Sequence, residues 1–292
     1  MRRQKKRSRE IINKILEIHP QTNKQLLSQV FGVCRRWLYQ KISLLQHKDA
    51  VLKEQILSVL SEFPSYGYRR ISVALCIGKK RVRRCMKLYG IKPYKRKSRW
   101  SKRRDKRRAP AVFQNQIKNH CPLTPNHTWV GDFTYLPFKG KFLYLATFMD
   151  LFTREIVGWN ISKKHTKDLV IQAFLNSLVN RQLERPQFVH SDQGCEYTAK
   201  DYTDLIEQFG ITVSMSKKAS PWENGYQESF FNNFKTDLGL EFDRFESEGH
   251  FLEAIHHTLH TYNHKRIHSA LNMPPVKFHT KYLHSLCTKR GA

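Results

Sequence analysis

The sequence has few acidic residues, no paired cysteine motif and no long apolar run. Asp and Glu total 24 against 52 Lys and Arg, which gives a formal charge of +28. Self-repulsion on this scale is tolerated mainly when a polyanion neutralises it, so nucleic acid is the expected partner. Because no apolar run reaches roughly 18 residues and no signal-peptide segment is evident, we expect no membrane association and a cytoplasmic protein.

Cysteine usage gives no candidate site. The six cysteines are scattered, and none belongs to a Cys-x-x-Cys pair. This spacing disfavours a zinc or redox centre and fits reduced thiols in a cytoplasm.

The positive charge is concentrated in the first part of the chain. Residues 1–110 carry 32 Lys and Arg against 6 Asp and Glu, whereas the remainder carries 20 against 18. A length of 292 residues predicts one substantial domain with one or two small ones. We therefore expect small basic units ahead of a nearly neutral larger domain.

Residues 1–48 are predicted to form a first helix-turn-helix-like unit. Apolar residues at helical spacing precede Gly32, which suits a turn, and a second apolar set follows it. Arg35 and Arg36 would then project toward DNA. A plain helical hairpin with a charged outer face explains this segment equally well.

A second helix-turn-helix-like unit is predicted over residues 49–93, with a break at Pro64. Its last helix, in "KKRVRRCMKLYGIKP", has one apolar stripe formed by Val82, Cys85, Met86 and Tyr89. The other faces are cationic, and we expect DNA contacts from Arg81, Arg83 and Arg84.

Residues 94–120 are predicted to be a basic linker, because they contain too little apolar surface to bury. Arg103 and Arg104 would follow a DNA backbone. A nuclear-localisation-like run is the plainer interpretation of the same composition.

From residue 121 the pattern changes to that of an α/β domain. Three short apolar strands come first, followed by a helix, a strand ending at "HSDQG", a helix closed by Gly210 and a further strand. The order β-β-β-α-β-α-β is that of a ribonuclease-H-like mixed sheet. We place this catalytic core at residues 121–242, preceded by the all-α units and followed by a C-terminal helix and tail at residues 243–292.

Three carboxylates of this core can form a metal site. Asp132 lies in the first strand, Asp192 follows the fourth, and Glu228 lies on the helix after the fifth. The first and fourth strands are neighbours in this topology, so Asp132 and Asp192 would meet. Phosphodiester chemistry of this kind uses two hard cations about 3.5 to 4 Å apart, and such cations prefer carboxylate oxygens.

Each carboxylate also has a plainer interpretation. Asp132 can be a solvated acid on a strand, Asp192 a turn former and Glu228 a surface helix residue. Together they favour the metal site over these separate roles. We interpret Asp150 as a supporting structural residue and Glu196 as a surface residue.

The helix expected from about Pro221 places Asn224, Glu228 and Lys235 on one face. On this face Glu228 would bind the metal, Asn224 would orient the ligand, and Lys235 would contact a DNA phosphate. Its opposite side is predicted to pack into the core through Phe230, Phe231, Phe234 and Leu238.

Three blocks, "WVGDFTYL", "HSDQGCEY" and "PWENGYQESFFNNFK", resemble the catalytic blocks of the insertion-sequence-three family of transposases, relatives of retroviral integrases. Asp192 and Glu228 are separated by 35 residues, as in the D,D(35)E signature of that superfamily. Lys235 matches the family's basic residue. The stretch before Glu228 departs from the pattern, because Glu223-Asn224 stands where many members have Asp-Asn.

The resemblance implies a DNA transposase that binds the terminal inverted repeats of its element, nicks one strand and joins the exposed 3′-hydroxyl to target DNA. It implies two Mg²⁺ ions, with Mn²⁺ as a substitute. A homo-oligomer on double-stranded DNA in the bacterial nucleoid is expected, and an upstream-frame helper protein is a further candidate partner.

Two alternatives to a transposase remain open at this stage. One is a ribonuclease-H-type nuclease that cuts without joining, and the other is a non-catalytic DNA-binding regulator. The late motif "YNHKRIHSAL" is also ambiguous, since it either lies near DNA or pins the last helix to the core through Tyr262, Asn263, Arg266 and His268.

Overall fold

A computed structural model describes residues 2–19, 21–34, 44–94, 113–117, 122–217, 224–239 and 241–290. The chain divides into two compact units, Met1–Gln55 and Ile56–Ala292, and the division falls within helix α4 (Leu44–Glu62). No helix in the described ranges is long and apolar enough to cross a membrane.

The first unit contains helices α1 (Arg2–Ile18) and α2 (Lys24–Val30). Asn23 caps α2 by accepting hydrogen bonds from two backbone N–H groups of its first turn. Gly32 follows with a φ of 59°, which confirms the predicted turn. Ile12, Leu27 and Val33 form a small core. The predicted second helix, with Arg35 and Arg36, lies outside the described residues.

The helical part of the second unit comprises the end of α4, α5 (Tyr68–Ala74) and α6 (Lys79–Leu88). The break predicted at Pro64 is present. Val82, Cys85 and Met86 are buried as predicted, whereas Tyr89 is 38% exposed. The linker residues Arg103 and Arg104 are outside the described residues.

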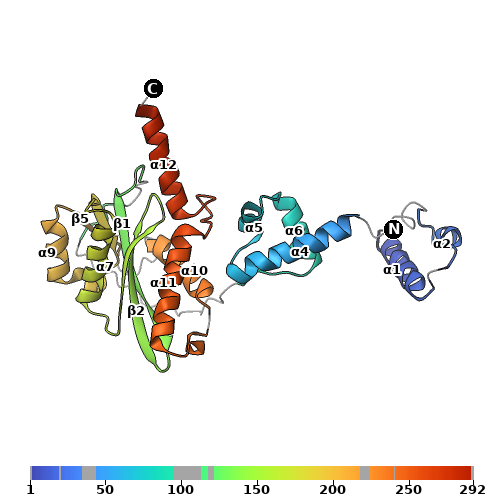
Figure 1. Ribbon diagram of the computed structural model, residues 1–292, viewed down its shortest axis with the longest axis horizontal. Coiled ribbons are helices and arrows are strands. Elements are labelled where there is room, and N and C mark those ends of the chain that lie inside the picture. Colours follow the sequence, from blue (N-terminus) through green and yellow to red (C-terminus); the bar gives the residue numbers. More distant parts are fainter. Residues whose placement is uncertain are drawn as a thin grey trace. The chain divides into compact units, whose positions relative to one another are not determined.

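A five-stranded mixed sheet forms the centre of the second unit (Figure 1). Strands β1 (Thr128–Phe138), β2 (Lys141–Asp150) and β3 (Ile156–Ser162) form an antiparallel meander. Strands β4 (Phe188–Ser191) and β5 (Thr212–Met215) are added in parallel, giving the order β3-β2-β1-β4-β5. The predicted ribonuclease-H-like α/β topology is therefore confirmed, and β1 lies at the centre of the sheet.

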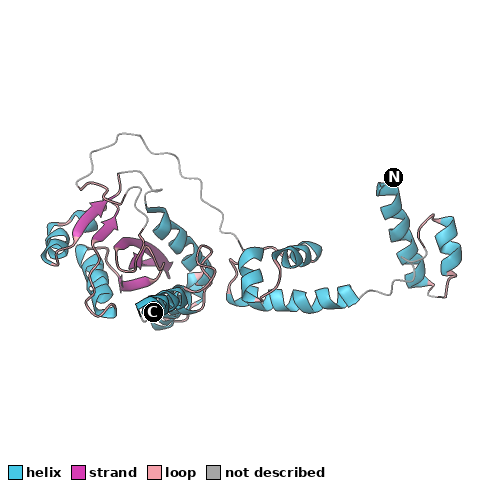
Figure 2. Cartoon of the chain, turned by 90° about the horizontal axis from the view of Figure 1, so that it is seen from above, coloured by secondary structure: helices cyan, strands magenta, loops and turns pink. Residues whose placement is uncertain are grey.

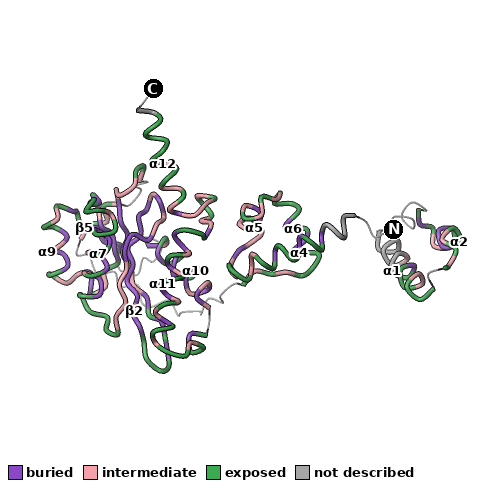
Figure 3. The backbone as a smooth tube through the Cα atoms, in the orientation of Figure 1, coloured by how far each residue is buried: buried purple, intermediate pink, exposed green. Residues whose placement is uncertain are grey.

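Helices cover both faces of the sheet (Figures 1 and 2). On one face, α7 (Lys167–Asn180) and α9 (Lys200–Gln208) enclose a core that includes Trp129, Phe148 and Phe174. On the other, α10 (Gly225–Asp237) and α11 (Glu248–His264) bury Phe234 and Phe251. The strands are largely buried in Figure 3, whereas the outer surfaces of these helices are exposed.

Short elements complete the fold. Helix α8 (Cys195–Thr198) follows β4, and the 3-10 helix η2 (Phe242–Arg244) precedes α11. The segment after α11, which we expected to be a tail, instead forms helix α12 (Pro275–Arg290). Its outer end is exposed in Figure 3.

Strand β3 approaches helix α7 so closely that Gly158 has no room for a side chain. A Cβ atom there would overlap the backbone of Ser177. We therefore expect Gly158→Ala to lower the free energy of unfolding by about 1–3 kcal/mol, measured by chemical denaturation. Gly249→Ala on α11 is the matched control, because a Cβ there meets nothing closer than 3.7 Å. Equal stability of the two variants would contradict the close packing.

Candidate active site

Two of the predicted carboxylates follow from the register of β1 and β4. Val130 pairs with His190 in this parallel ladder. Asp132 and Asp192 each lie two residues further along in the same direction, so they lie level at one end of the paired strands. Asp192 is the first residue after β4, and its charge acts on the Asp132 carboxylate, so the two side chains lie near each other.

The Asp132 carboxylate feels the charges of both other predicted ligands, Asp192 and Glu228. The pKa of Asp132 is raised to about 7, first by burial and then by the charges of Asp192 and Glu228. The Phe133 N–H, which donates to Asp132 at 2.8 Å, and the Lys235 ammonium oppose this increase. The pKa of Asp192 is also raised, by burial and by Glu196. A cation between these side chains would relieve their repulsion.

The turn after Asp192 is tightly packed at Gly194. The Gly194 N–H donates to Asp192 Oδ1 at 2.9 Å. A Cβ atom at this position would lie 3.1 Å from both Asp192 Oδ1 and Glu196 Oε2, so a larger residue would push these carboxylates outward by a few tenths of an ångström. The φ of Gly194, −61°, is open to any residue.

Helix α10 supplies the third carboxylate, Glu228, which is exposed in the first turn of the helix. Glu228 is near enough to affect the pKa of Asp132. Its neighbour Gln227 is fully buried and donates from Nε2 to Val130 O at 2.6 Å and Thr147 O at 3.3 Å. Gln227 thus fixes the start of the helix on strands β1 and β2. The sequence offered a signal for it, an amide among the apolar residues of the core-facing side.

Asn224 does not lie on the exposed face predicted for it. It precedes the first residue of α10 and is 7% exposed, and its Nδ2 donates to Gly131 O at 3.5 Å. This burial favours a role in positioning α10 on β1 over the predicted DNA contact. Lys235, in the last turn, lies with its Nζ 4.9 Å from the centre of the Tyr135 ring.

The described residues contain no group of three His, Cys, Asp or Glu side chains close enough to hold a metal ion. The charges of Asp192 and Glu228 both act on Asp132, but within the described residues the three carboxylates do not converge as ligands. Their donor chemistry still fits hard divalent cations, because all three offer carboxylate oxygens. The buried hydroxyl of Tyr197 has no hydrogen-bond partner among the described residues, and its pKa is raised by burial and by Asp132 and Asp192.

Glu196 was predicted to be a surface residue, and this prediction was wrong. The side chain is 5% exposed, and its Oε1 lies 2.8 Å from His165 Nδ1. Burial is the largest single effect and raises the pKa of Glu196, but hydrogen bonds from His165, the Glu196 backbone and Cys195, with the charge of His165, together lower it. The turn-like sequence around it gave no signal of this partner, which comes from a segment 31 residues earlier.

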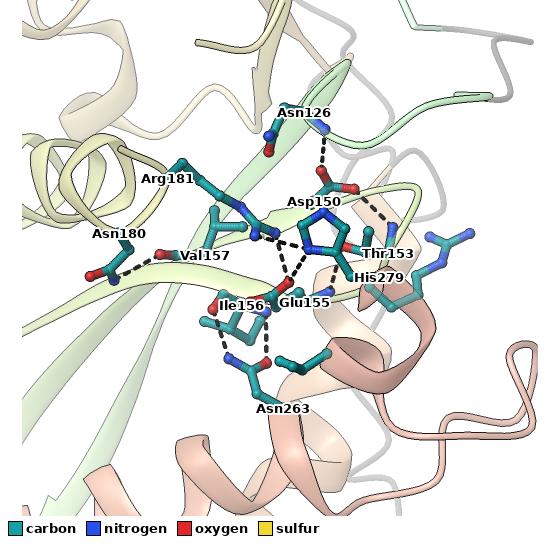
Figure 4. Close-up of polar contacts among 12 residues, drawn as sticks. Asn126, Asp150, Thr153, Glu155, Ile156, Val157, Asn180, Arg181, Asn263 and His279 are labelled. Atoms are coloured by element: carbon teal, nitrogen blue, oxygen red, sulfur yellow. Dashed lines mark hydrogen bonds and ion pairs between the residues drawn. The ribbon is translucent and has the colours of Figure 1, made fainter. Parts of the chain in front are cut away.

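Asp150 has the structural role that we predicted. Its carboxylate accepts hydrogen bonds from the backbone N–H groups of Asn126, Phe152 and Thr153 at 2.5–2.8 Å, which shapes the turn between β2 and β3 (Figure 4). Nearby, Glu155 binds Arg181 at 2.7 Å and His279 of α12 at 3.4 Å (Figure 4). These contacts attach α12 to the core.

The motif at the end of α11 pins elements together. Asn263 both accepts from and donates to the backbone of Ile156 at 2.9 Å, as Figure 4 shows. Tyr262 donates from its hydroxyl to Arg154 O at 3.1 Å. These contacts resolve the alternative left open by the sequence in favour of a structural role for both residues.

Arg266 links the core to the helical part of the same unit. The guanidinium is 3% exposed and donates to Asp237 on α10 at 2.5 Å and to Ser65 at 2.8 Å. It also reaches Asn233 at 3.0 Å. The helix that carries Glu228 is therefore tied to the residues that precede α5.

Comparison with known proteins identifies the class. Two models described as integrase core domain match residues 122–221 and 209–275. The transposase for insertion sequence element IS904 of Lactococcus lactis subsp. lactis (strain IL1403) is 33% identical over 254 residues, covering 84% of this chain and 99% of that protein. Transposase InsF for insertion sequence IS3A of Escherichia coli (strain K12) is 36% identical over 113 residues, 39% of each protein. The HTLV-2 integrase catalytic core domain in complex with magnesium superimposes with a TM-score of 0.45 and 23% identity, covering 54% of this chain and 98% of that one.

The strand order and the family matches define a DDE-type polynucleotidyl transferase with an integrase catalytic core. The chain belongs to the insertion-sequence-three family of transposases. The chain therefore acts in DNA transposition and integration.

The buried Arg266–Asp237 pair gives a stability prediction. Arg266→Ala leaves Asp237 buried without its cation, so the free energy of unfolding should fall by about 3–5 kcal/mol in chemical denaturation. Lys163→Ala is the control, because it breaks an ion pair with Glu248 whose side chains are 68% and 41% exposed. That control should cost less than about 1 kcal/mol. Equal losses of stability in the two variants would show that the buried Arg266–Asp237 pair contributes no more than an exposed ion pair.

His268 gives a pH prediction. Burial and the charges of Arg154, Arg266 and Arg70 lower its pKa from 6.5 to about 4. Between pH 6.5 and about 4, His268 is protonated in the unfolded chain but neutral in the folded one. The unfolded chain therefore binds more protons, so the stability that neutral His268 allows is complete above pH 6.5 and is lost as the pH falls toward 4. As the pH falls below 6.5, the free energy of unfolding of the native chain, measured by chemical denaturation, should therefore decrease more steeply than that of His268→Gln. The difference should reach up to about 1.4 kcal/mol per pH unit. Parallel pH profiles would contradict the low pKa.

Proposed function

We propose that Asp132, Asp192 and Glu228 bind two Mg²⁺ ions, with Mn²⁺ as a substitute, and that the chain cleaves and joins DNA at the terminal inverted repeats of its own element. The observation that supports this most directly is the parallel β1–β4 register, which levels Asp132 with Asp192. The raised pKa of Asp132 adds a physical reason for a cation to bind there.

When bound, the two ions would activate the attacking oxygen and stabilise the leaving oxygen of a phosphodiester. The protein side chains have separate tasks. Asp132 on β1 and Asp192 just after β4 would supply oxygen ligands. Gln227 and Asn224 hold the start of α10 against β1, and Glu228 would bind the ions from this helix. Lys235, at the other end of that helix, would contact a DNA phosphate.

The proposed function also includes DNA contacts from arginines that precede the catalytic core. Arg81, Arg83 and Arg84 are exposed on α6, as phosphate contacts require. Arg35, Arg36, Arg103 and Arg104 lie outside the described residues and stay predictions. We expect binding by these residues to weaken steeply with salt, because each phosphate contact releases counterions.

Two element ends have to be processed together, so we propose a homo-oligomer on double-stranded DNA, acting at the bacterial nucleoid in the cytoplasm. An upstream-frame helper protein is a second proposed partner. Light scattering of the complex with an element end gives the number of copies bound. A single copy would exclude the oligomer, and a specific complex with both ends formed by this chain alone would exclude an essential helper.

The catalytic proposal is tested by strand cleavage and joining on a labelled duplex that carries the element end. Asp132→Asn, Asp192→Asn and Glu228→Gln should each reduce joined product at least about a hundredfold, the scale of losing one transition-state contact, while DNA binding persists. Glu207→Gln, an exposed acid on α9, is the matched control and should retain activity.

Other outcomes of this assay would identify the rival functions. Metal-dependent cutting without joining would indicate a nuclease. Binding with neither cutting nor joining, with a helper supplied, would indicate a regulator. Full activity of all three carboxylate variants would exclude this site.

A further inference from the structure

A strongly basic pocket lies between the helical part of the second unit and the segment after α11. Its volume is about 710 Å³. One wall is cationic, with Arg69, Arg70, Lys79, Lys80 and Arg83 from α5 and α6. The opposite wall comes from the core side of the unit and includes Ile267, Ser269 and Asn272. The described residues that line it include no Asp or Glu.

Specific hydrogen bonds hold the two walls together. Arg70 Nε donates to Ser269 Oγ at 3.0 Å, and its guanidinium lies 5.3 Å from the centre of the Tyr66 ring. The Tyr66 hydroxyl in turn accepts the Ile267 N–H at 2.6 Å. The pocket is therefore a built feature that joins segments about 200 residues apart in the chain.

Among the residues that the structure describes, positive charge around this pocket exceeds negative charge. Arg70 Nη1 is buried and finds no hydrogen-bond partner within the same part of the chain. Leaving a buried charged donor unpaired is costly, which favours a ligand that supplies an acceptor. Arg266, another cation, lies near enough to lower the pKa of Arg70 further after the effect of burial. Within the described residues, Asp237 is the carboxylate that opposes these charges, and Arg266 already binds it.

The distribution of the cations favours an extended ligand over a small anion. Lys79, Lys80 and Arg83 are exposed on α6, while Arg69 is exposed on α5. Charges spread in this way over two helices match the spaced phosphates of a nucleic-acid backbone, which carries one negative charge per roughly 1.7 Å of duplex axis. Ser269 and Asn272 add polar side chains suited to phosphate oxygens.

We propose that this pocket binds the sugar–phosphate backbone of duplex DNA without reading its sequence. The inference rests on the proposed function, because it takes DNA as the substrate, and it adds a binding site formed jointly by α5, α6 and residues 267–272. Arg266, one residue before this segment, is bound to Asp237 at the end of α10. DNA in the pocket is thereby held at a fixed spacing from the helix that carries Glu228.

The test measures DNA binding in a chelator, so that catalysis does not enter. Binding of two unrelated fluorescein-labelled duplexes is followed by anisotropy across salt from about 50 to 200 mM. Lys79→Ala with Lys80→Ala should weaken binding of both duplexes roughly tenfold and reduce the salt slope by about two. Lys277→Ala with Lys281→Ala is the control, since it removes two exposed lysines from α12.

A second variant tests the wall formed by the core. Asn272 is exposed with a φ of 56°, a conformation that Asp tolerates, so Asn272→Asp adds one negative charge with little change in shape. Like the lysine double variant, Asn272→Asp should weaken the binding of both duplexes. Unchanged melting temperatures establish that the variants are folded.

The possible results separate cleanly. Weaker binding by both pocket variants but not by the control supports the pocket. No loss, an equal loss in the control, or a loss confined to the lysine variant overturns it. Failure of the proposed function is distinct, because it would leave the native chain without strand joining whatever these binding curves show.

Discussion

The parallel pairing of β1 with β4 is the constraint on which the rest of the site depends. Hydrogen bonds between these central strands bring Asp132 level with Asp192, although 59 residues lie between them in the chain. Helices on both faces bury the strands, so the register is set by the core and not by the carboxylates. The packing free energy of the domain can therefore offset the repulsion between two acids held close together.

The sequence predicted the parts of this structure that depend on local patterns. Strand alternation and helix periodicity predicted the order of the core elements, and Gly32 and Pro64 marked a turn and a helix break that the structure contains. Topology then brought Asp132 beside Asp192. These predictions succeeded because apolar periodicity and turn chemistry act over a few residues, where the sequence can be interpreted directly.

The remaining features depend on partners distant in the sequence. Asn224 was placed on an exposed helix face, but α10 begins one residue later and the side chain turns toward β1. Glu196 is buried because His165 pairs with it. Gln227 has a structural role because it donates hydrogen bonds to the backbone of β1 and β2. The second helix of the first unit and most of the basic linker lie outside the described residues, so their roles stay predictions.

The Arg266 contacts also bear on how such proteins can change during evolution. Ser65 in the helical part, Asn233 and Asp237 on α10, and the guanidinium between them form one buried arrangement. A recombination event that exchanged the helical part alone would leave Arg266 facing a foreign surface. Exchange of the helical part between relatives should therefore include the matching residues of the core, so that these segments are inherited together.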